Sequence, residues 1–238
     1  MDSGHVAYQR RYFSRPEEKP RMRPAGSRYA RRHLEAVLAT IDPEPGMRLL
    51  EIGCGMGRFS LLLAEEGFEV TAVDLSPALL AELANHDPSG SVSTVCCDAT
   101  ELDRHVEGPF DAAVGFFFLH HLDDLEPVLR AAARVLSPGG RVAFCEPNAF
   151  NPLFYLQILA TPGMTWRGDG GVARMRPSVF ATAFAQSGLD RPRLQRYGLF
   201  PPLLANSTLG GRVEPVFEKI PLIRPLLAFQ VVSGVRQS

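Results

Sequence analysis

A turn rich in glycine carries the clearest chemical signal in the sequence. The apolar residues 49–52 lead directly into residues 53–57, in which Gly53, Gly55 and Gly57 occupy every second position. Because glycine has no Cβ atom, such a turn can adopt positive φ angles and let a ligand approach its backbone N–H groups. A helix that begins immediately after the turn would add its positive N-terminal end. We therefore expect a polar or anionic ligand at residues 53–57.

An acid follows the next predicted strand at a distance that suits a nucleoside ligand. Asp74 stands 23 residues after Glu51, and a carboxylate at this place in an α/β fold accepts hydrogen bonds from ribose hydroxyls. The dinucleotide pattern G-x-G-x-x-G is not met, because its third glycine would fall at the position of Arg58. This spacing argues against a nicotinamide dinucleotide as the ligand.

Two histidines and a glutamate stand at the ends of two further predicted strands. His120 and His121 follow one strand and Glu146 leaves the next, at the edge where open parallel sheets bind their ligands. Histidine titrates close to neutral pH and can take a proton from a hydroxyl group, so His120 is the first candidate base and His121 the second. Glu146 is a candidate acceptor for a substrate hydroxyl or amine. The alternative for the two histidines is that an imidazole caps the following helix or packs on the ligand. The alternative for Glu146 is that it caps the loop before Pro147.

The other side chains able to carry chemistry are expected to be structural. Asp123 and Asp124 precede a helical pattern, so they are interpreted as N-caps, and no metal is expected. The cysteines lack the spacing of a zinc or disulfide framework and adjoin apolar runs. A catalytic thiol at Cys145 is the alternative to the structural interpretation. Buried, reduced thiols are expected at four positions: Cys54, Cys96, Cys97 and Cys145.

An alternation of strand-like and helical segments positions these residues. The pattern predicts an α/β fold with a mostly parallel sheet, right-handed crossovers and helices on both faces. Seven strands are expected; the last strand is expected to be antiparallel, and the final two strands to form an antiparallel edge of the sheet. The predicted strands are residues 48–52, 69–73, 93–97, 110–116, 140–145, 193–199 and 226–232, and the predicted helices are residues 28–41, 59–66, 77–85, 125–136 and 177–186.

Composition sets broad limits on the function. A chain of 238 residues with 45% apolar residues can enclose one domain, and its net charge of −1 gives no broad field for gathering a polyanion, so nucleic acid is not an expected partner. The N-terminal residues 1–24 lack the apolar stretch of a secretion signal, and no apolar run is long enough to cross a bilayer. A cytoplasmic protein is expected.

Five segments together resemble the ordered motifs of class I methyltransferases: residues 50–57, 73–76, 97–100, 110–123 and 136–142. The resemblance spans about half of the chain and implies a Rossmann-like fold with S-adenosylmethionine as cofactor. It implies that Gly53 and Gly55 line the methionine moiety, that Asp74 binds the ribose, and that Asp98 and Ala99 border the adenine. The full set of expected cofactor-binding residues is Glu51, Gly53, Cys54, Gly55, Gly57, Asp74, Leu75, Asp98, Ala99 and Phe116.

Three of the residues in this region have competing interpretations. Glu51 holds the ammonium group of the cofactor or fixes the turn. Asp98 contacts the adenine or caps the end of its loop. Arg58 pairs with the cofactor carboxylate or lies exposed on its helix, and exposure is the favoured interpretation.

The substrate is expected to contact segments that exceed the minimal fold. These are an N-terminal arm, residues 1–27, and two insertions at about residues 149–176 and 200–224 of the single domain formed by residues 28–238. The insertions are rich in apolar and aromatic residues, which suggests an apolar or aromatic-bearing small molecule. Alternatives are internal packing, a dimer contact or a peripheral membrane surface, so monomer and homodimer both stay open. The arm is interpreted as a lid or as disordered.

The expected activity is methyl transfer to a small molecule, with O-methylation preferred because of the two histidines. One alternative is a cyclase or rearrangement catalyst that keeps the cofactor without transferring its methyl group. Another is a binding module without chemistry.

Overall fold

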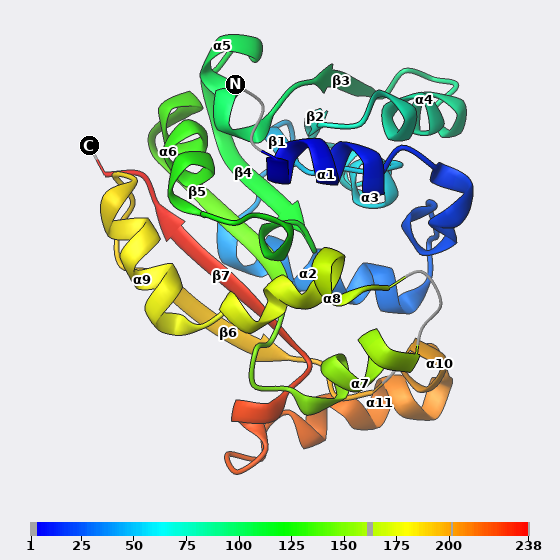
Figure 1. Ribbon diagram of the computed structural model, residues 1–238. Coiled ribbons are helices and arrows are strands. Elements are labelled where there is room, and N and C mark those ends of the chain that lie inside the picture. Colours follow the sequence, from blue (N-terminus) through cyan, green and yellow to red (C-terminus); the bar gives the residue numbers. More distant parts are fainter. Residues whose placement is uncertain (1–3, 161–163, 201, 238) are drawn as a thin grey trace.

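A seven-stranded sheet forms the centre of the molecule (Figure 1), in the strand order β3-β2-β1-β4-β5-β7-β6. The computed structural model describes residues 4–160, 164–200 and 202–237. Strands β1 to β5 are parallel, and β7 runs antiparallel to both of its neighbours. The predicted fold class is confirmed. The strands are β1 (Arg48–Ile52), β2 (Glu69–Asp74), β3 (Val92–Cys96), β4 (Phe110–Phe116), β5 (Leu136–Pro147), β6 (Arg193–Tyr197) and β7 (Phe229–Val235).

Helices cover both faces of the sheet. On one face lie α2 (Arg28–Ile41), α3 (Arg58–Glu65) and α4 (Pro77–His86), and on the other lie α5 (Leu102–His105), α6 (Glu126–Val135) and α9 (Pro177–Gln186). Each packs an apolar stripe onto the strands, as the buried Leu34, Val37 and Ile41 of α2 illustrate. The hydroxyl of Ser27 accepts a hydrogen bond from Ala30 N at 3.1 Å, which fixes where α2 begins.

The remaining helices belong to the arm and the two insertions. They are α1 (Gly4–Tyr12), α7 (Pro152–Ala160), α8 (Trp166–Asp169), α10 (Pro202–Ala205) and α11 (Thr208–Phe217). In Figure 1, α1 lies in front of α3 and above the arrowhead of β4, while α7, α10 and α11 gather at the lower end of the molecule. None of the helices within the described residues combines the length and hydropathy that a bilayer crossing requires.

Candidate active site

The glycine turn joins β1 to α3 and is strongly bent. Gly53, Gly55 and Gly57 have φ angles of 74°, 57° and 79°, a region that residues with a Cβ atom rarely adopt. The backbone N–H of Gly53 donates to the carbonyl of Val73 at 2.8 Å, which ties the turn to the end of β2. The turn is therefore held in a fixed shape by the neighbouring strand.

Two of the glycines leave room for other side chains. A Cβ atom on Gly53 would lie 2.3 Å from the ring of Phe118, and one on Gly55 would lie 2.6 Å from the terminal methyl of Met22. Both neighbours are side chains from other segments, one after β4 and one from the N-terminal arm. The faces of Gly53 and Gly55 are therefore in close contact with side chains from these two segments, next to the end of β4.

Three expected cofactor-binding residues are placed in the packing around the turn. A Cβ atom on Gly57 would lie 2.6 Å from the side chain of Leu83, so this glycine permits contact with α4. The ring of Phe116 stacks on Phe59 of α3, with centroids 3.9 Å apart. Cys54 is buried, and burial raises the pKa of its thiol. These contacts give all three a packing role.

Asp74 joins the turn to the end of β2. One of its carboxylate oxygens, Oδ2, accepts from Gly55 N at 2.8 Å, and Oδ1 accepts from Ser76 N at 2.8 Å. Burial raises the pKa of this carboxyl group. A carboxylate has about four acceptor positions, so two hydrogen bonds from the backbone leave capacity for hydroxyl donors. The partly buried Leu75 continues the chain beside it.

Glu51 lies inside the protein and bonds to α3. Its side chain is 1% exposed, and the hydroxyl of Ser60 donates to Oε2 at 2.5 Å. Burial raises the pKa of Glu51 to about 8, so the group is mostly protonated at neutral pH. This contact gives Glu51 the role of fixing the turn against α3.

Arg58 is not exposed, and the favoured expectation was wrong. Its residue is partly buried, and its Nε atom is buried without a hydrogen-bond partner among the described residues. Burial also lowers the pKa of the guanidinium group. An unsatisfied buried donor is costly, so this position next to the glycine turn suits an anionic partner. The carboxylate of S-adenosylmethionine is such a group, and the residues at the turn fit this cofactor.

Asp98 caps the short turn that follows β3. Its Oδ1 accepts from the backbone N–H of Thr100 at 2.9 Å and from the Thr100 hydroxyl at 2.8 Å. The following residue, Ala99, is buried. Oδ1 of Asp98 therefore caps this turn, as one of the two interpretations predicted. Only Oδ2 is left to accept a hydrogen bond from an adenine amine.

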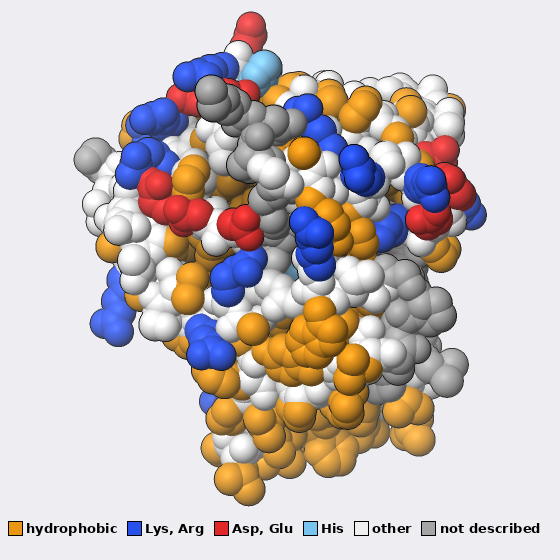
Figure 2. Space-filling model, in the orientation of Figure 1, with side chains coloured by type: hydrophobic (Ala, Val, Ile, Leu, Met, Phe, Trp, Pro, Cys, Tyr) orange, Lys and Arg blue, Asp and Glu red, His pale blue; other side chains and the backbone are white. Residues whose placement is uncertain are grey.

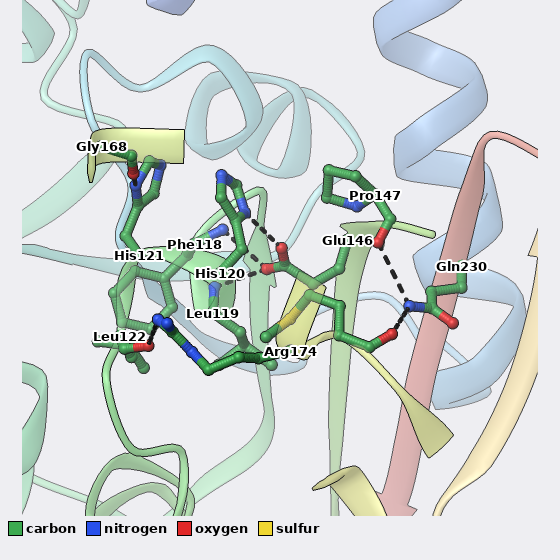
Figure 3. Close-up of polar contacts among 11 residues, drawn as sticks. Phe118, Leu119, His120, His121, Leu122, Glu146, Pro147, Gly168, Arg174 and Gln230 are labelled. Atoms are coloured by element: carbon green, nitrogen blue, oxygen red, sulfur yellow. Dashed lines mark hydrogen bonds and ion pairs between the residues drawn. The ribbon is translucent and has the colours of Figure 1, made fainter. Parts of the chain in front are cut away.

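Glu146 and His120 form a buried pair between the ends of β4 and β5 (Figure 3). Glu146 is fully buried, and its Oε1 accepts from the backbone N–H groups of Phe118 at 2.8 Å and Leu119 at 2.6 Å. Its Oε2 lies 2.7 Å from Nδ1 of His120. Because a carboxylate only accepts, Nδ1 donates and Nε2 carries the lone pair. Glu146 orients the candidate base instead of reaching for a substrate.

An unusual backbone at Phe117 makes this pair possible. Phe117 has a φ of 57°, which is rare for a bulky residue, and its N–H donates to Cys145 O at 2.8 Å. The chain turns sharply after this residue. As a result the next two N–H groups point at Glu146, and the ring of Phe118 lies over Gly53. Strained residues of this kind concentrate at functional sites.

Comparisons with known proteins agree with this geometry. A family model described as a methyltransferase domain matches residues 50–144. The ubiquinone biosynthesis O-methyltransferase of Xanthomonas oryzae pv. oryzae is 34% identical over 128 residues, which are 53% of this chain and 53% of that protein. The chain thus spans about half the length of the curated relatives it matches. Residues 50–144 thus match the methyltransferase-domain family, and the chain is similar to S-adenosylmethionine-dependent methyltransferases.

Two solved structures illustrate the shared fold. The phosphoethanolamine N-methyltransferase 2 of Haemonchus contortus has a TM-score of 0.62 and 19% identity, covering 100% of this chain and 58% of that one. A methyltransferase from Archaeoglobus fulgidus has a TM-score of 0.60 and 20% identity, covering 92% of this chain and 97% of that one. The similarity in fold therefore extends beyond the segment that the family model matches.

The N-terminal arm lies against the second histidine, His121. Nδ1 of His121 is 2.9 Å from Gly168 O, and the amide of Gln9 donates to His121 O at 3.1 Å. The hydroxyl of Tyr12 donates to Asp169 at 3.0 Å. One ligand atom each from His120, His121 and Asp169 lie within 4.8 Å of one another. The aromatic residues of the arm indicated that it could contact the site, but the sequence analysis did not identify Asp169 as a residue near the histidines.

A buried histidine on the other side of the β4 turn escaped the sequence analysis. Nδ1 of His33 lies 2.7 Å from the hydroxyl of Tyr197, which is 2.9 Å from Sγ of Cys145. Burial lowers the pKa of His33 to about 3 and raises that of the Cys145 thiol. Neither group is charged at neutral pH, which argues against a catalytic thiol. Cys96 is exposed, so the expectation of four buried thiols was wrong there.

A separate cleft lies beside α2. It has a volume of about 530 Å³ and is lined by residues from α2, α10 and α11, among them Tyr29, Arg32 and Glu214. None of its lining residues is one of the candidate site residues, so it offers an alternative place for a ligand.

Proposed function

We propose that this methyltransferase transfers the methyl group of S-adenosylmethionine to a hydroxyl oxygen of a small apolar or aromatic-bearing molecule. The observation that carries the proposal is the buried Glu146–His120 pair, which directs a histidine lone pair to the mouth of β4 beside the glycine turn. The relatives named as ubiquinone biosynthesis O-methyltransferases support oxygen as the acceptor atom. The identity of the acceptor molecule is left for the turnover experiment to determine.

The cofactor would lie along the carboxyl ends of β1 to β4. When bound, S-adenosylmethionine supplies a methyl group on a positively charged sulfur, which is an excellent leaving group. Gly53 and Gly55 would line its methionine moiety, and Arg58 would pair with its carboxylate. Asp74 would accept from the ribose hydroxyls. Asp98 would accept from the adenine amine through Oδ2.

His120 would remove the proton that the acceptor hydroxyl loses as its oxygen attacks the methyl carbon. A base positioned in this way contributes rate because the attacking oxygen becomes a better nucleophile as it loses its proton. Glu146 would act as a positioning residue. Its hydrogen bond holds the tautomer that exposes the Nε2 lone pair and stabilises the imidazolium that forms.

The arm and the first insertion would close the site over the acceptor. The ring of Phe13 packs edge-on against His121, with centroids 5.1 Å apart, and the backbone carbonyl of Phe13 accepts from Ser76. From the insertion, Phe154 approaches His120 with a centroid distance of 6.4 Å. These rings would exclude water and present an apolar surface to the acceptor.

The proposal is tested by turnover of the full-length chain with methyl-labelled S-adenosylmethionine and a panel of apolar phenols and alcohols. We expect labelled methyl ether and one equivalent of S-adenosylhomocysteine for each product. Turnover should fall strongly in His120→Ala, which lacks the candidate base. Consumption of an acceptor without release of S-adenosylhomocysteine would identify the cyclase or rearrangement alternative. Labelled N-methyl product from amine analogues, with none from the alcohols, would overturn the choice of oxygen.

A further inference from the structure

Among the described residues, the large hydrophobic side chains that are exposed all belong to residues 150–226. Figure 2 shows hydrophobic side chains gathered over the lower end of the molecule, where α7 and α11 lie in Figure 1. Lys and Arg side chains border this area from above. Within the described residues, the large hydrophobic side chains that are exposed are Phe150, Leu153, Leu156, Leu159, Trp166, Leu204, Leu209, Val216, Phe217, Ile220, Leu222 and Leu226. We call this set the apolar face.

The sequence of helix α7 places large hydrophobic side chains on the side of the helix that faces solvent. Its solvent side carries Leu153, Leu156 and Leu159, which are 58%, 60% and 68% exposed, and the helix contains no charged residue. Helix α9 is of similar length and also lies at the surface, but its solvent side carries small and polar residues such as Ser178 and Thr182. A surface helix whose exposed side is mostly leucine favours contact with a nonaqueous partner.

Hydrogen bonds hold the two insertions together as one surface. The side-chain amide of Asn151, which precedes α7, donates to Leu226 O at 2.6 Å. The amide of Asn148 donates to the carbonyls of Pro225 and Leu227, both at 2.8 Å. Both amides lie in a buried position. The start of α7 and the segment after α11 are thus fixed side by side, and their exposed side chains form a continuous face.

The charge of this region differs from that of the rest of the chain. Residues 150–226 contain nine Lys and Arg against four Asp and Glu, a balance of +5, whereas the remaining residues carry −6. Two of the four acids, Asp169 and Glu214, are buried and hydrogen-bonded. The guanidinium of Arg196 lies 5.6 Å from the ring centre of Phe150, at the apolar face itself. Apolar side chains bordered by cations are complementary to an anionic lipid surface.

We propose that the apolar face docks this protein on the surface of an anionic phospholipid bilayer. The apolar side chains would enter the boundary between headgroups and acyl chains, while the surrounding cations face the phosphates. The face also leads to the candidate base, because Phe154 on the inner side of α7 approaches His120. A lipophilic acceptor could then pass from the bilayer to His120 along α7. This last step rests on the proposed function, whereas docking itself does not.

The test is flotation of the full-length protein with vesicles, without cofactor or acceptor. Equimolar phosphatidylglycerol and phosphatidylcholine provide the anionic surface, and pure phosphatidylcholine provides the neutral one. We expect binding to the anionic vesicles that weakens as salt is added. Leu156→Asp and Leu222→Asp should each weaken binding about tenfold or more, since each replaces an inserted side chain with a charge. Ala84→Asp places the same charge on the exposed side of α4 and should bind as the parent does.

Folding and self-association are checked on the same variants. Leu156 and Leu222 are 60% and 86% exposed, so the melting temperature and the affinity for S-adenosylhomocysteine should match those of the parent. Failure of the parent to float with either vesicle, or equal binding to both, would overturn the proposal. So would a dimer in sedimentation equilibrium that both substitutions dissociate, because the face would then join two copies. Intact docking without any methyl transfer would count against the proposed function alone.

Discussion

The carboxyl ends of the strands and the apolar face differ in which side chains they bury and which they expose. At the strand ends, polar groups are paired and partly or fully buried, as in Asp74 with the glycine turn and Glu146 with His120. On the apolar face, hydrophobic groups such as Leu156 and Leu222 are exposed. Buried polar pairs that are fully hydrogen-bonded rigidify the structure around them, which a reaction centre needs. Exposed apolar groups do not position particular atoms; they only favour contact with a nonaqueous partner.

The largest effect is expected at His120. His120→Ala removes the oriented lone pair, and turnover should fall by about 100-fold to 10,000-fold, the usual contribution of a general base. The affinity for S-adenosylhomocysteine, measured by calorimetry, should stay the same. Glu146→Gln should lower turnover less and shift the pH profile, since it leaves an imidazole in place without the carboxylate that orients it. Equal turnover of His120→Ala and parent would return both residues to a packing role.

A smaller effect is expected at the ribose position. Asp74→Ala removes a buried acceptor of charge-assisted hydrogen bonds, and the affinity for S-adenosylhomocysteine should weaken by about 1–3 kcal/mol. Glu69→Ala is the matched control, because Glu69 is an exposed acid at the opposite end of the same strand. Unchanged affinity in Asp74→Ala would remove this residue from the cofactor site.

The predictable part of the molecule is the part that local chemistry determines. The bounds of α2 and α9 were predicted without error, since Ser27 caps the first and Pro177 begins the second. The strand predicted at 226–232 begins three residues later, at Phe229, because Pro225 sets a turn that an apolar run does not reveal. Candidate cofactor residues could be proposed from the sequence because glycines and acids at strand ends are typical of nucleoside-binding sites, and their contact with the cofactor stays a prediction.

The rest depended on contacts between distant segments. The pairing of Glu146 with His120 joins residues 26 positions apart and depends on the positive φ of Phe117, which no pattern predicts. The burial of Arg58 likewise arises from neighbours on other elements. The acceptor could not be read from the insertions, because their apolar composition specifies a kind of surface and no particular partner.

The pH dependence of the free energy of unfolding should show the effect of burying Glu51 beside the glycine turn. The pKa of Glu51 is raised from 4.5 to about 8, so between these values the folded state keeps a proton that the unfolded chain has released. Stability therefore falls as pH rises through this window, by about 2 kcal/mol from pH 6.5 to 8. Glu51→Gln cannot ionise and should flatten this slope in urea unfolding. Parallel slopes for variant and parent would show that Glu51 is ionised in the folded protein.

The smallest effect is expected in the arm. Tyr12→Phe removes the hydrogen bond to Asp169, which is worth about 1 kcal/mol, so the KM for the acceptor should rise by a factor of about 5. Tyr8→Phe is the control, because it removes a hydroxyl from the same helix. A KM identical to that of the parent in Tyr12→Phe would mean that the arm does not close over the acceptor.

The central claim is that the glycine turn and Asp74 bind the adenosyl cofactor. Hydrogen–deuterium exchange of the full-length protein, with and without saturating S-adenosylhomocysteine, tests it directly. We predict slower exchange at the amides of residues 53–57 and 74–76, with that of α11 unchanged. Protection confined to the cleft between α2 and α11, or no protection at the turn, would contradict it.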